Sequence, residues 1–260
     1  MEGSVPFPDH LTKLGILPGI KVDKGAKQLA NTENEKITDG LDGLRDRLKE
    51  YYELGARFAK WRAVITIGEN MPTSYCISTN AHALARYAAL CQEQGLVPIV
   101  EPEILMDGTH TIDESYQLTT ETLYNVFYEL VSQGVELEGI VLKPNMVLSG
   151  YDCSDQASVE QVAEMTVDCF LNTVPAVVPG IAFLSGGQSD ELATAHLNAM
   201  NQIDGTPWNL TFSYGRALQA PALKAWSGKD ENISNAQEAF MNRAKFNSLA
   251  TKGEYSKDME

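Results

Sequence analysis

Lys143 closes a short apolar run, Gly139-Ile-Val-Leu-Lys-Pro144, and carries the amine in this sequence best placed to attack a carbonyl. A lysine in such a strand either extends its stem to reach solvent or is held as an amine within a pocket. Two more cations, Lys60 and Arg62, are two residues apart on another predicted strand, so their side chains share a face. Nearby positive charge and partial desolvation both lower the pKa of a lysine. The pattern therefore predicts a neutral, nucleophilic amine at Lys143.

Two carboxylates, Glu101 and Glu103, end another apolar run and also share one strand face because they are two residues apart. Neighbouring carboxylates separate each other's proton affinities, so that one can donate a proton while the other stays ionised. This pattern is typical of acid and base catalysis. The alternative is structural, with the two acids serving as ion-pair partners for Lys60, Arg62 and Lys143. Both interpretations require these charges to lie close together.

Two glycine-containing motifs indicate a phosphorylated ligand. Ser185-Gly186-Gly187 follows an apolar strand and precedes a helical segment, where backbone N–H groups can approach an anion. A plain tight turn is the alternative for these glycines. Gly215-Arg216 closes the last predicted strand, and a guanidinium suits phosphate recognition. In a barrel of alternating strands and helices, the loops after the last two strands are the usual phosphate site.

The histidines give no sign of a metal site. The sequence has four of them, without the spacing of zinc ligands: His10, His82, His110 and His196. We therefore expect no metal cofactor. Without a metal to polarise a ketone, an enamine route through a lysine is the natural alternative.

The segments that must position these residues alternate between short apolar runs and longer amphipathic stretches. We expect strands at 19–22, 57–64, 96–103, 139–144, 180–186 and 209–216. We expect helices at 40–54, 79–94, 114–133, 156–173 and 189–201. Strands that alternate with helices form βα units and a parallel sheet.

The spacing of the strands favours a barrel over an open sheet. A polar residue closes nearly every predicted strand, at intervals of 39, 41, 42, 42 and 31 residues: Lys21, Lys60, Glu101, Lys143, Ser185 and Arg216. A doubly wound fold would carry a glycine-rich nucleotide loop after its first strand, and none is present. We predict a single (β/α)8-type barrel domain over residues 1–260 with six of its eight strands. Residues 241–260 are expected to be a final helix that fades into a polar tail.

Composition limits the class of protein. With 43% hydrophobic and 21% charged residues, the chain can bury a sizeable core. A net charge of −15 excludes general binding to nucleic acid or to anionic membranes. The sequence has no long apolar run, no signal-peptide pattern at its start and no CxxC motif among Cys76, Cys91, Cys153 and Cys169. We expect a soluble, cytoplasmic protein with reduced thiols.

Seven segments closely resemble the class I fructose-bisphosphate aldolases of animals and plants, in family order and with family spacing. They are GIKVDKG (19–25), GLDGL (40–44), FAKWRAV (58–64), LVPIVEPE (96–103), LKPNMV (142–147), VPGIAFLSGGQS (178–189) and FSYGRALQA (212–220). The resemblance covers nearly the whole chain. It implies reversible cleavage of fructose 1,6-bisphosphate to dihydroxyacetone phosphate and glyceraldehyde 3-phosphate, in glycolysis and gluconeogenesis. It also implies a homotetramer that uses no metal.

The resemblance also implies a role for individual residues. Lys143 would form the Schiff base with the substrate ketone, and Glu101 would be the general acid and base for carbinolamine dehydration. Glu103 and Lys60 would tune the charge around Glu101. Lys60 with Arg62 would hold the phosphate at the far end of the substrate. The remaining implied substrate-binding residues are Lys21 and, for the phosphate of the dihydroxyacetone end, Ser185, Gly186, Ser213, Gly215 and Arg216.

The sequence departs from the family pattern at both ends. Family members have further sequence before GIKVDKG, with two strands and an active-site aspartate on the first, and a C-terminal tail that ends in tyrosine. This leaves a second hypothesis open, a catalytically impaired fragment that retains only binding or oligomer-forming surfaces and docks onto full-length subunits or a cytoskeletal partner. A third is a Schiff-base aldolase for another sugar phosphate, such as sedoheptulose bisphosphate. Preference between fructose 1,6-bisphosphate and fructose 1-phosphate is open.

Overall fold

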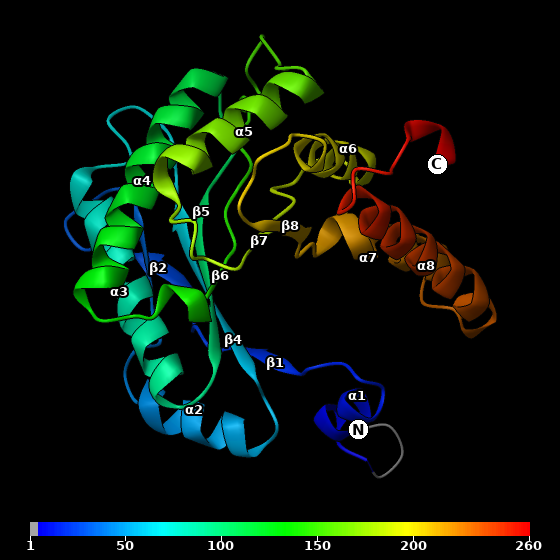
Figure 1. Cartoon of the computed structure of the whole chain (residues 1–260), viewed down its shortest axis with the longest axis horizontal. Coiled ribbons are helices and arrows are strands. Elements are labelled where there is room, and N and C mark those ends of the chain that lie inside the picture. The colour runs from blue at the N-terminus through cyan, green and yellow to red at the C-terminus, as the bar shows by residue number, and fades with distance from the viewer. Residues whose placement is uncertain (1–4) are drawn as a thin grey trace. The chain divides into compact units, whose positions relative to one another are not determined.

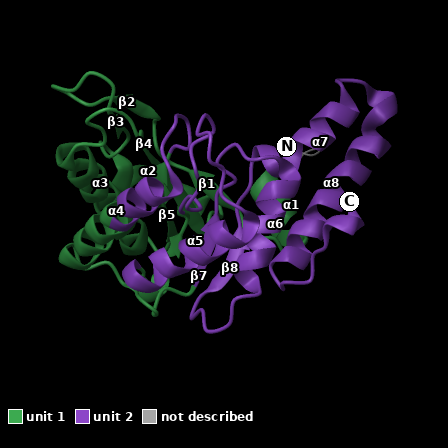
Figure 2. Ribbon diagram, turned by 90° about the horizontal axis from the view of Figure 1, so that it is seen from above, with its two compact units in different colours: residues 1–104, 121–143, 174–179 green, residues 105–120, 144–173, 180–260 purple. Residues whose placement is uncertain are grey.

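Strands and helices alternate along most of the chain in the computed structural model, which describes residues 5–260 (Figure 1). By contacts between residues, the chain divides into two compact units (Figure 2). Unit 1 comprises the residues up to Ile104 together with Glu121–Lys143 and Val174–Pro179. Unit 2 comprises Leu105–Thr120, Pro144–Thr173 and Gly180–Glu260.

Unit 1 is built on four parallel strands. In order of pairing these are β1 (Gly19–Lys21), β4 (Phe58–Ile65), β5 (Val97–Ile104) and β6 (Val141–Leu142). A short antiparallel hairpin, β2 (Ala26–Gln28) and β3 (Lys36–Thr38), lies between β1 and β4 in the chain. The helices are α1 (Phe7–Lys13), α2 (Leu44–Glu53), α3 (Ser74–Glu93) and the 3-10 turn η1 (Leu137–Gly139). Helix α4 (Ile112–Ser132) is shared between the units, with the division at Thr120.

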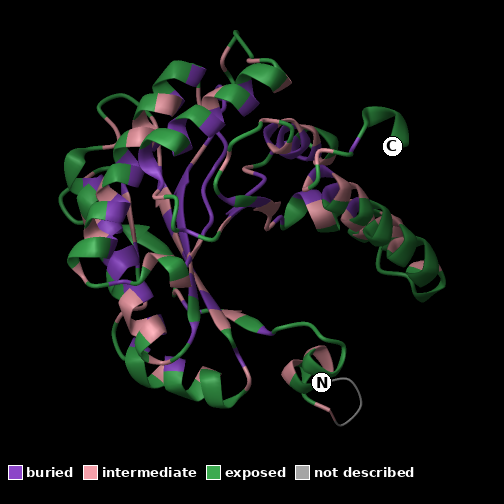
Figure 3. Ribbon diagram, in the orientation of Figure 1, coloured by how far each residue is buried: buried purple, intermediate pink, exposed green. Residues whose placement is uncertain are grey.

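The strand β4 shows how the sequence separates core from site. Its residues alternate between partly exposed and buried along all eight positions, as the period of a strand requires. Trp61 belongs to the buried set and stacks on Tyr87 of α3 with ring centroids 5.6 Å apart. Lys60 and Arg62 belong to the other set and therefore point away from this helix. Figure 3 shows the buried residues concentrated on the strands and on the helix faces turned toward them.

Unit 2 contains two parallel strands, β7 (Gly180–Phe183) and β8 (Asn209–Phe212), whose register pairs Phe183 with Phe212. Phe183 is buried and stacks on Phe170, with ring centroids 5.7 Å apart. The helices of this unit are α5 (Val159–Thr173), α6 (Asp190–Asn201), α7 (Arg216–Trp226), α8 (Ile233–Ala250) and the 3-10 turns η2 (Asp230–Asn232) and η3 (Lys257–Met259).

The predicted α/β architecture and its six parallel strands are confirmed, but some boundaries were wrong. The strand expected over 209–216 ends at Phe212, and Arg216 is the first residue of α7 rather than a strand end. Gly215 explains the difference, because its φ of −93° and ψ of −83° turn the chain out of the strand and into the helix. The strand expected over 139–144 is only two residues long. The hairpin β2–β3 was missed because its two strands have three residues each.

In unit 2, α8 ends at Ala250, and the residues after it fold back toward α6. Tyr255 is buried, its backbone N–H donates to the side-chain oxygen of Asn198 at 2.9 Å, and its ring lies beside Phe246. The single barrel domain expected over residues 1–260 stays a prediction.

Two expectations about the chemistry of the chain can be compared with the structure. All four cysteines are free thiols, and burial raises the pKa of Cys91 to about 12, which keeps it protonated at neutral pH. Among residues 5–260, no helix combines the length and apolar character that crossing a membrane requires.

Two leucines of α2 provide a test of this packing. Leu48 is 0% exposed and Leu54, at the C-cap, is 61% exposed. Leu48→Ala should lower the free energy of unfolding by about 2–5 kcal/mol because it leaves a cavity in unit 1. Leu54→Ala is the matched control and should change it by less than about 0.5 kcal/mol. Urea unfolding followed by circular dichroism measures both, and equal losses would contradict the assigned packing of α2.

Candidate active site

Lys143, Glu101 and Lys60 form a chain of charges in unit 1. The Lys143 side chain is largely buried, with 8% of the residue exposed, and its Nζ lies 3.1 Å from Oε1 of Glu101. The other carboxylate oxygen of Glu101 accepts a hydrogen bond from Nζ of Lys60 at 2.6 Å. Each oxygen of this buried carboxylate therefore faces one ammonium group.

The strand register explains why these three residues meet. Strands β5 and β6 pair Ile99 with Val141 and continue in step, so that Glu101 lies level with Lys143. The backbone N–H of Lys143 donates to the carbonyl oxygen of Val100 at 2.8 Å, which extends the parallel ladder one residue beyond β6. The register of these two parallel strands therefore places Lys143, the predicted nucleophile, beside Glu101, the predicted acid–base group.

The surroundings of Lys143 lower its pKa below that of an ordinary lysine. Burial of the amine is the largest cause, and the positive charge of Lys60 acts in the same direction. Glu101 opposes both effects through its charge and its hydrogen bond, and Glu103 does so through its charge. The result is a larger neutral fraction at a given pH than a solvent-exposed lysine would have, which is what attack on a carbonyl needs.

Glu103 is paired separately from Glu101. Its carboxylate accepts a hydrogen bond from Nε of Arg62, whose side chain remains partly exposed. Each of the two carboxylates thus has a cationic partner, as both interpretations of these acids require. The two carboxylates nevertheless differ, because within residues 5–260 the ion pair of the Lys143 amine is with Glu101.

Asp23 is a member of this cluster that the sequence analysis missed. Its buried carboxylate binds the ammonium of Lys21 and accepts the backbone N–H of Gly25 at 3.0 Å. Its second oxygen faces the backbone N–H of Arg62 at 3.4 Å. Lys21 itself stays largely exposed at the end of β1. An aspartate two residues before a glycine, just after a strand, is a turn signal that could have pointed to it.

The loop Ser185–Gln188 in unit 2 is a tight turn that only glycines fill easily. The backbone N–H of Gln188 donates to the Ser185 carbonyl at 3.1 Å, and the central residues Gly186 and Gly187 have φ values of +60° and +90°. Positive φ at both central positions strains any residue with a Cβ atom. The hydroxyl of Tyr151 donates to the carbonyl of Gly186 from the other side. The glycines therefore form a tight turn, and whether this turn binds a phosphate stays a prediction.

The segment that joins β8 to α7 lies next to this loop in unit 2 and contains Ser213, Gly215 and Arg216. The backbone N–H of Ser213 donates to the Phe183 carbonyl at 2.9 Å, which continues the β7–β8 ladder. Gly215 is the N-cap of α7, and Arg216 begins that helix. A Cβ atom placed on Gly187 would lie 3.6 Å from Nη2 of Arg216, so the guanidinium lies against the loop. A helix start, a guanidinium and a glycine turn together suit a phosphate.

The predicted residues thus form two groups, one in each unit. Unit 1 holds Lys21, Lys60, Arg62, Glu101, Glu103 and Lys143. Unit 2 holds Ser185, Gly186, Ser213, Gly215 and Arg216. Their individual roles stay predictions.

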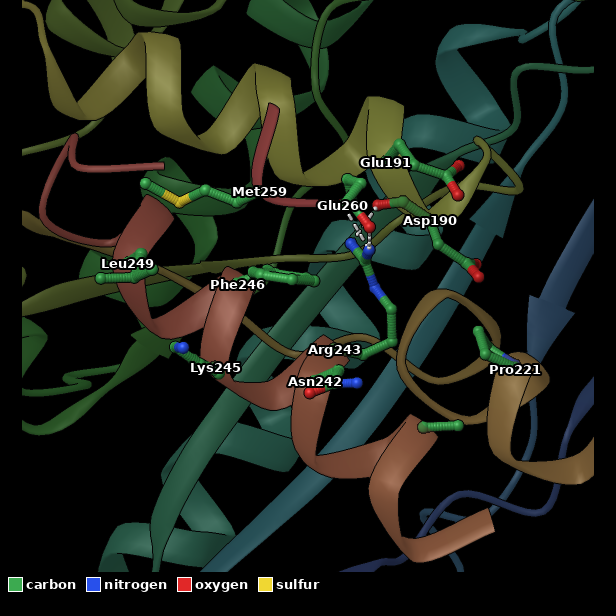
Figure 4. A pocket seen from close by; sticks show the side chains of 11 residues that line it. Asp190, Glu191, Pro221, Asn242, Arg243, Lys245, Phe246, Leu249, Met259 and Glu260 are labelled. Atoms are coloured by element: carbon green, nitrogen blue, oxygen red, sulfur yellow. Dashed lines mark hydrogen bonds and ion pairs between the residues drawn. The ribbon is translucent and has the colours of Figure 1, made fainter. Parts of the chain in front are cut away.

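A cavity of about 760 Å³ lies in unit 2 and is lined by residues of α6, α7, α8 and the C-terminal segment (Figure 4). The guanidinium of Arg243 is buried there and bridges Glu260, at 2.5 Å, and the backbone carbonyl of Asp190, at 3.1 Å. Thr194 accepts a further hydrogen bond from Arg243 at 2.6 Å. None of the predicted site residues lines this cavity, so size alone does not locate the chemistry.

The electrostatic balance at Lys143 can be tested by removing one charge. Because Lys60 lowers the pKa of Lys143, Lys60→Met should raise it. Acetic anhydride reacts only with neutral amines, so mass spectrometry of Lys143 acetylation against pH should give a curve displaced to higher pH. Lys49→Met, on the exposed face of α2, should leave the curve in place. An unmoved curve in Lys60→Met, or one displaced to lower pH, would show that the assigned cause is wrong.

Comparison with known proteins identifies the family. The sequence model described as "Fructose-bisphosphate aldolase class-I" matches residues 1–260. A Xylella fastidiosa protein named "Probable fructose-bisphosphate aldolase class 1" is 59% identical over 255 residues, which cover 98% of this chain and 76% of that protein. Fructose-bisphosphate aldolase 4, cytosolic, of Arabidopsis thaliana is 56% identical, covering 98% of this chain and 65% of that one.

A solved structure agrees with both matches. The fructose-bisphosphate aldolase of Plasmodium falciparum, crystallised with TRAP and a small-molecule inhibitor, superposes with a TM-score of 0.96 at 51% identity. The match covers 98% of this chain and 74% of that chain. The predicted family, fold class and enzyme activity are confirmed, and the matches favour the enzyme over the impaired-fragment hypothesis. This chain belongs to the class I fructose-bisphosphate aldolases, enzymes that act on phosphorylated sugars through a Schiff base rather than a metal.

Proposed function

We propose that Lys143 is the Schiff-base nucleophile of this aldolase and that Glu101 is its general acid and base. The observation that carries the proposal is the 3.1 Å contact between Nζ of Lys143 and Oε1 of Glu101, within a buried cluster that also lowers the pKa of the amine. A general acid or base must lie within hydrogen-bond reach of the proton that it moves. Glu101 meets that requirement for every proton transfer at the lysine nitrogen.

The proposed chemistry follows from this arrangement. The neutral amine of Lys143 attacks the substrate ketone and the C–O π bond opens. Glu101 carries to the oxygen the proton that the nitrogen loses, which gives a carbinolamine, and Glu101 then takes up a proton from solvent. Glu101 then protonates the departing hydroxyl, water leaves, and the nitrogen lone pair forms the protonated imine. That imine accepts the electron pair of the bond between its α carbon and the hydroxyl-bearing β carbon as this bond breaks. The β hydroxyl gives its proton to water and becomes the carbonyl of the aldehyde that leaves, and an enamine of the dihydroxyacetone end stays on Lys143. Hydrolysis of the imine formed on reprotonation returns the free lysine.

Lys60, Arg62 and Lys21 are proposed to bind the far end of the substrate, with Glu103 and Asp23 holding two of them in place. The support is their shared position in unit 1 and the ion pairs Arg62–Glu103 and Lys21–Asp23. The phosphate of the dihydroxyacetone end is proposed to bind at residues 185, 186, 213, 215 and 216. The support is the positive-φ turn at Gly186 and the guanidinium of Arg216 beside it.

Borohydride trapping tests the Schiff base directly. Incubation with dihydroxyacetone phosphate and sodium borohydride should reduce the imine to a stable adduct on Lys143, detected by peptide mass spectrometry. Lys143→Arg should abolish the adduct because a guanidinium does not form the imine, whereas Lys49→Arg should retain it. An unlabelled Lys143 in the wild-type chain, or labelling of another lysine in its place, would sink the assignment.

We further propose that the protein is a cytoplasmic homotetramer. The cytosolic names of the Arabidopsis thaliana relatives support the location, and the family resemblance supports the assembly. Sedimentation equilibrium should give about four times the 28.5 kDa mass of one chain. A mass that stays near 28.5 kDa across micromolar concentrations would contradict the assembly. The TRAP complex of the Plasmodium falciparum relative supports a protein partner as an additional proposal.

A further inference from the structure

A buried histidine on α6 is hydrogen-bonded to the turn that carries Ser185 and Gly186. Nδ1 of His196 lies 2.6 Å from Oε1 of Gln188, and Nε2 of Gln188 donates to the carbonyl oxygen of Ser185 at 2.9 Å. His196 is 2% exposed and Gln188 is 8% exposed, so water does not compete freely for these bonds. A side chain two helical turns into α6 is thereby connected to the backbone of the loop.

The direction of each hydrogen bond follows from the chemistry of the groups. The Ser185 carbonyl can only accept, so the amide nitrogen of Gln188 must face it and the amide oxygen must face His196. That oxygen can only accept, so Nδ1 of His196 carries the proton. Burial lowers the pKa of His196 to about 4, although Glu160 on α5 opposes the effect, and the ring is therefore neutral near pH 7. Its buried Nε2 is then a bare lone pair rather than an orphaned donor.

The carbonyl of Ser185 receives both of its hydrogen bonds from Gln188, one from the backbone N–H and one from the side chain. The peptide bond that joins Ser185 to Gly186 is planar, with its N–H directed opposite to its C=O. When the carbonyl is held on Gln188, the Gly186 N–H is therefore aimed away from Gln188. The proposed function assigns residue 186 to the substrate phosphate, and this backbone N–H is the only donor that a glycine can offer to it.

We propose that His196 and Gln188 are positioning residues that preset the Ser185–Gly187 turn for phosphate. The inference rests on the proposed phosphate role of Ser185 and Gly186. His196 orients the amide of Gln188, Gln188 holds the Ser185 carbonyl, and the carbonyl sets the direction of the Gly186 N–H. Neither His196 nor Gln188 touches the ligand in this account.

The test compares a ketone with phosphate and one without it. Lys143 is trapped with borohydride over a range of dihydroxyacetone phosphate concentrations, and separately over a range of dihydroxyacetone concentrations. His196→Ala should raise the half-saturating concentration of dihydroxyacetone phosphate about fivefold, the scale of one lost hydrogen bond. The half-saturating concentration of dihydroxyacetone should stay within about twofold, because that ketone has no phosphate to contact the turn.

Two further variants separate positioning from packing. His196→Asn supplies an amide N–H near the place of Nδ1 and should restore the wild-type response to within about twofold. Gln188→Met keeps the length of the side chain but removes its donor and acceptor, and should behave like His196→Ala. Thr194→Val is the matched control, since Thr194 is buried on the same helix but bonds to Asn247 of α8 instead of the turn.

Several outcomes would overturn the proposal. Unchanged half-saturation by dihydroxyacetone phosphate in His196→Ala would do so, as would an equal rise for both ketones or an equal rise in Thr194→Val. Equilibrium dialysis with inorganic phosphate measures binding at the turn without any reaction at Lys143. His196→Ala should bind this probe about fivefold more weakly than wild type. If wild-type Lys143 forms no adduct with either ketone, the Schiff-base function fails instead, and the phosphate measurement alone decides the role of His196.

Discussion

The carboxylate of Glu101 is the interaction on which the cluster in unit 1 depends. It is buried, and a buried carboxylate without partners would cost several kcal/mol of stability. Lys60 and Lys143 are the partners of this carboxylate, with one amine at each oxygen. The same two contacts hold the amine of Lys143 at the end of a strand that has only two residues in regular pairing. The structural need for these contacts and the proposed chemical role therefore coincide at the carboxylate of Glu101.

The part of this cluster that could be predicted is the part that follows from strand geometry. Residues two apart on a strand share a face, which correctly joined Lys60 to Arg62 and Glu101 to Glu103. Parallel strands at nearly equal intervals then brought their polar ends into register. Strand periodicity carries no information about where a chain turns, and so it placed Arg216 in a strand when Gly215 had already redirected the backbone into α7.

The contacts that escaped prediction depend on how side chains reach across loops. Asp23 lies just beyond β1, and its partners Lys21 and Gly25 became evident only once the turn was formed. In the sequence, His196 is one of four histidines without the spacing of zinc ligands, and nothing else marks it. Its partner is the neutral amide of Gln188, a residue type that gives no signal in a search for charge or metal chemistry. In both cases a buried polar group is hydrogen-bonded to a residue that no pattern in the sequence singles out.

In the proposed reaction, the charges around Lys143 would answer two demands that conflict. Attack on the ketone requires a neutral amine, which burial and the charge of Lys60 both favour. The protonated imine that follows is a cation in the same buried place, where burial and Lys60 now act against it. Glu101 opposes the first step by raising the pKa of the amine, and for the same reason it stabilises the imine cation. A carboxylate already held 3.1 Å from the nitrogen needs little rearrangement when that charge develops. Burial and Lys60 lower the pKa of Lys143 while Glu101 opposes them, and such opposed causes suit a site proposed to serve both states of the same nitrogen.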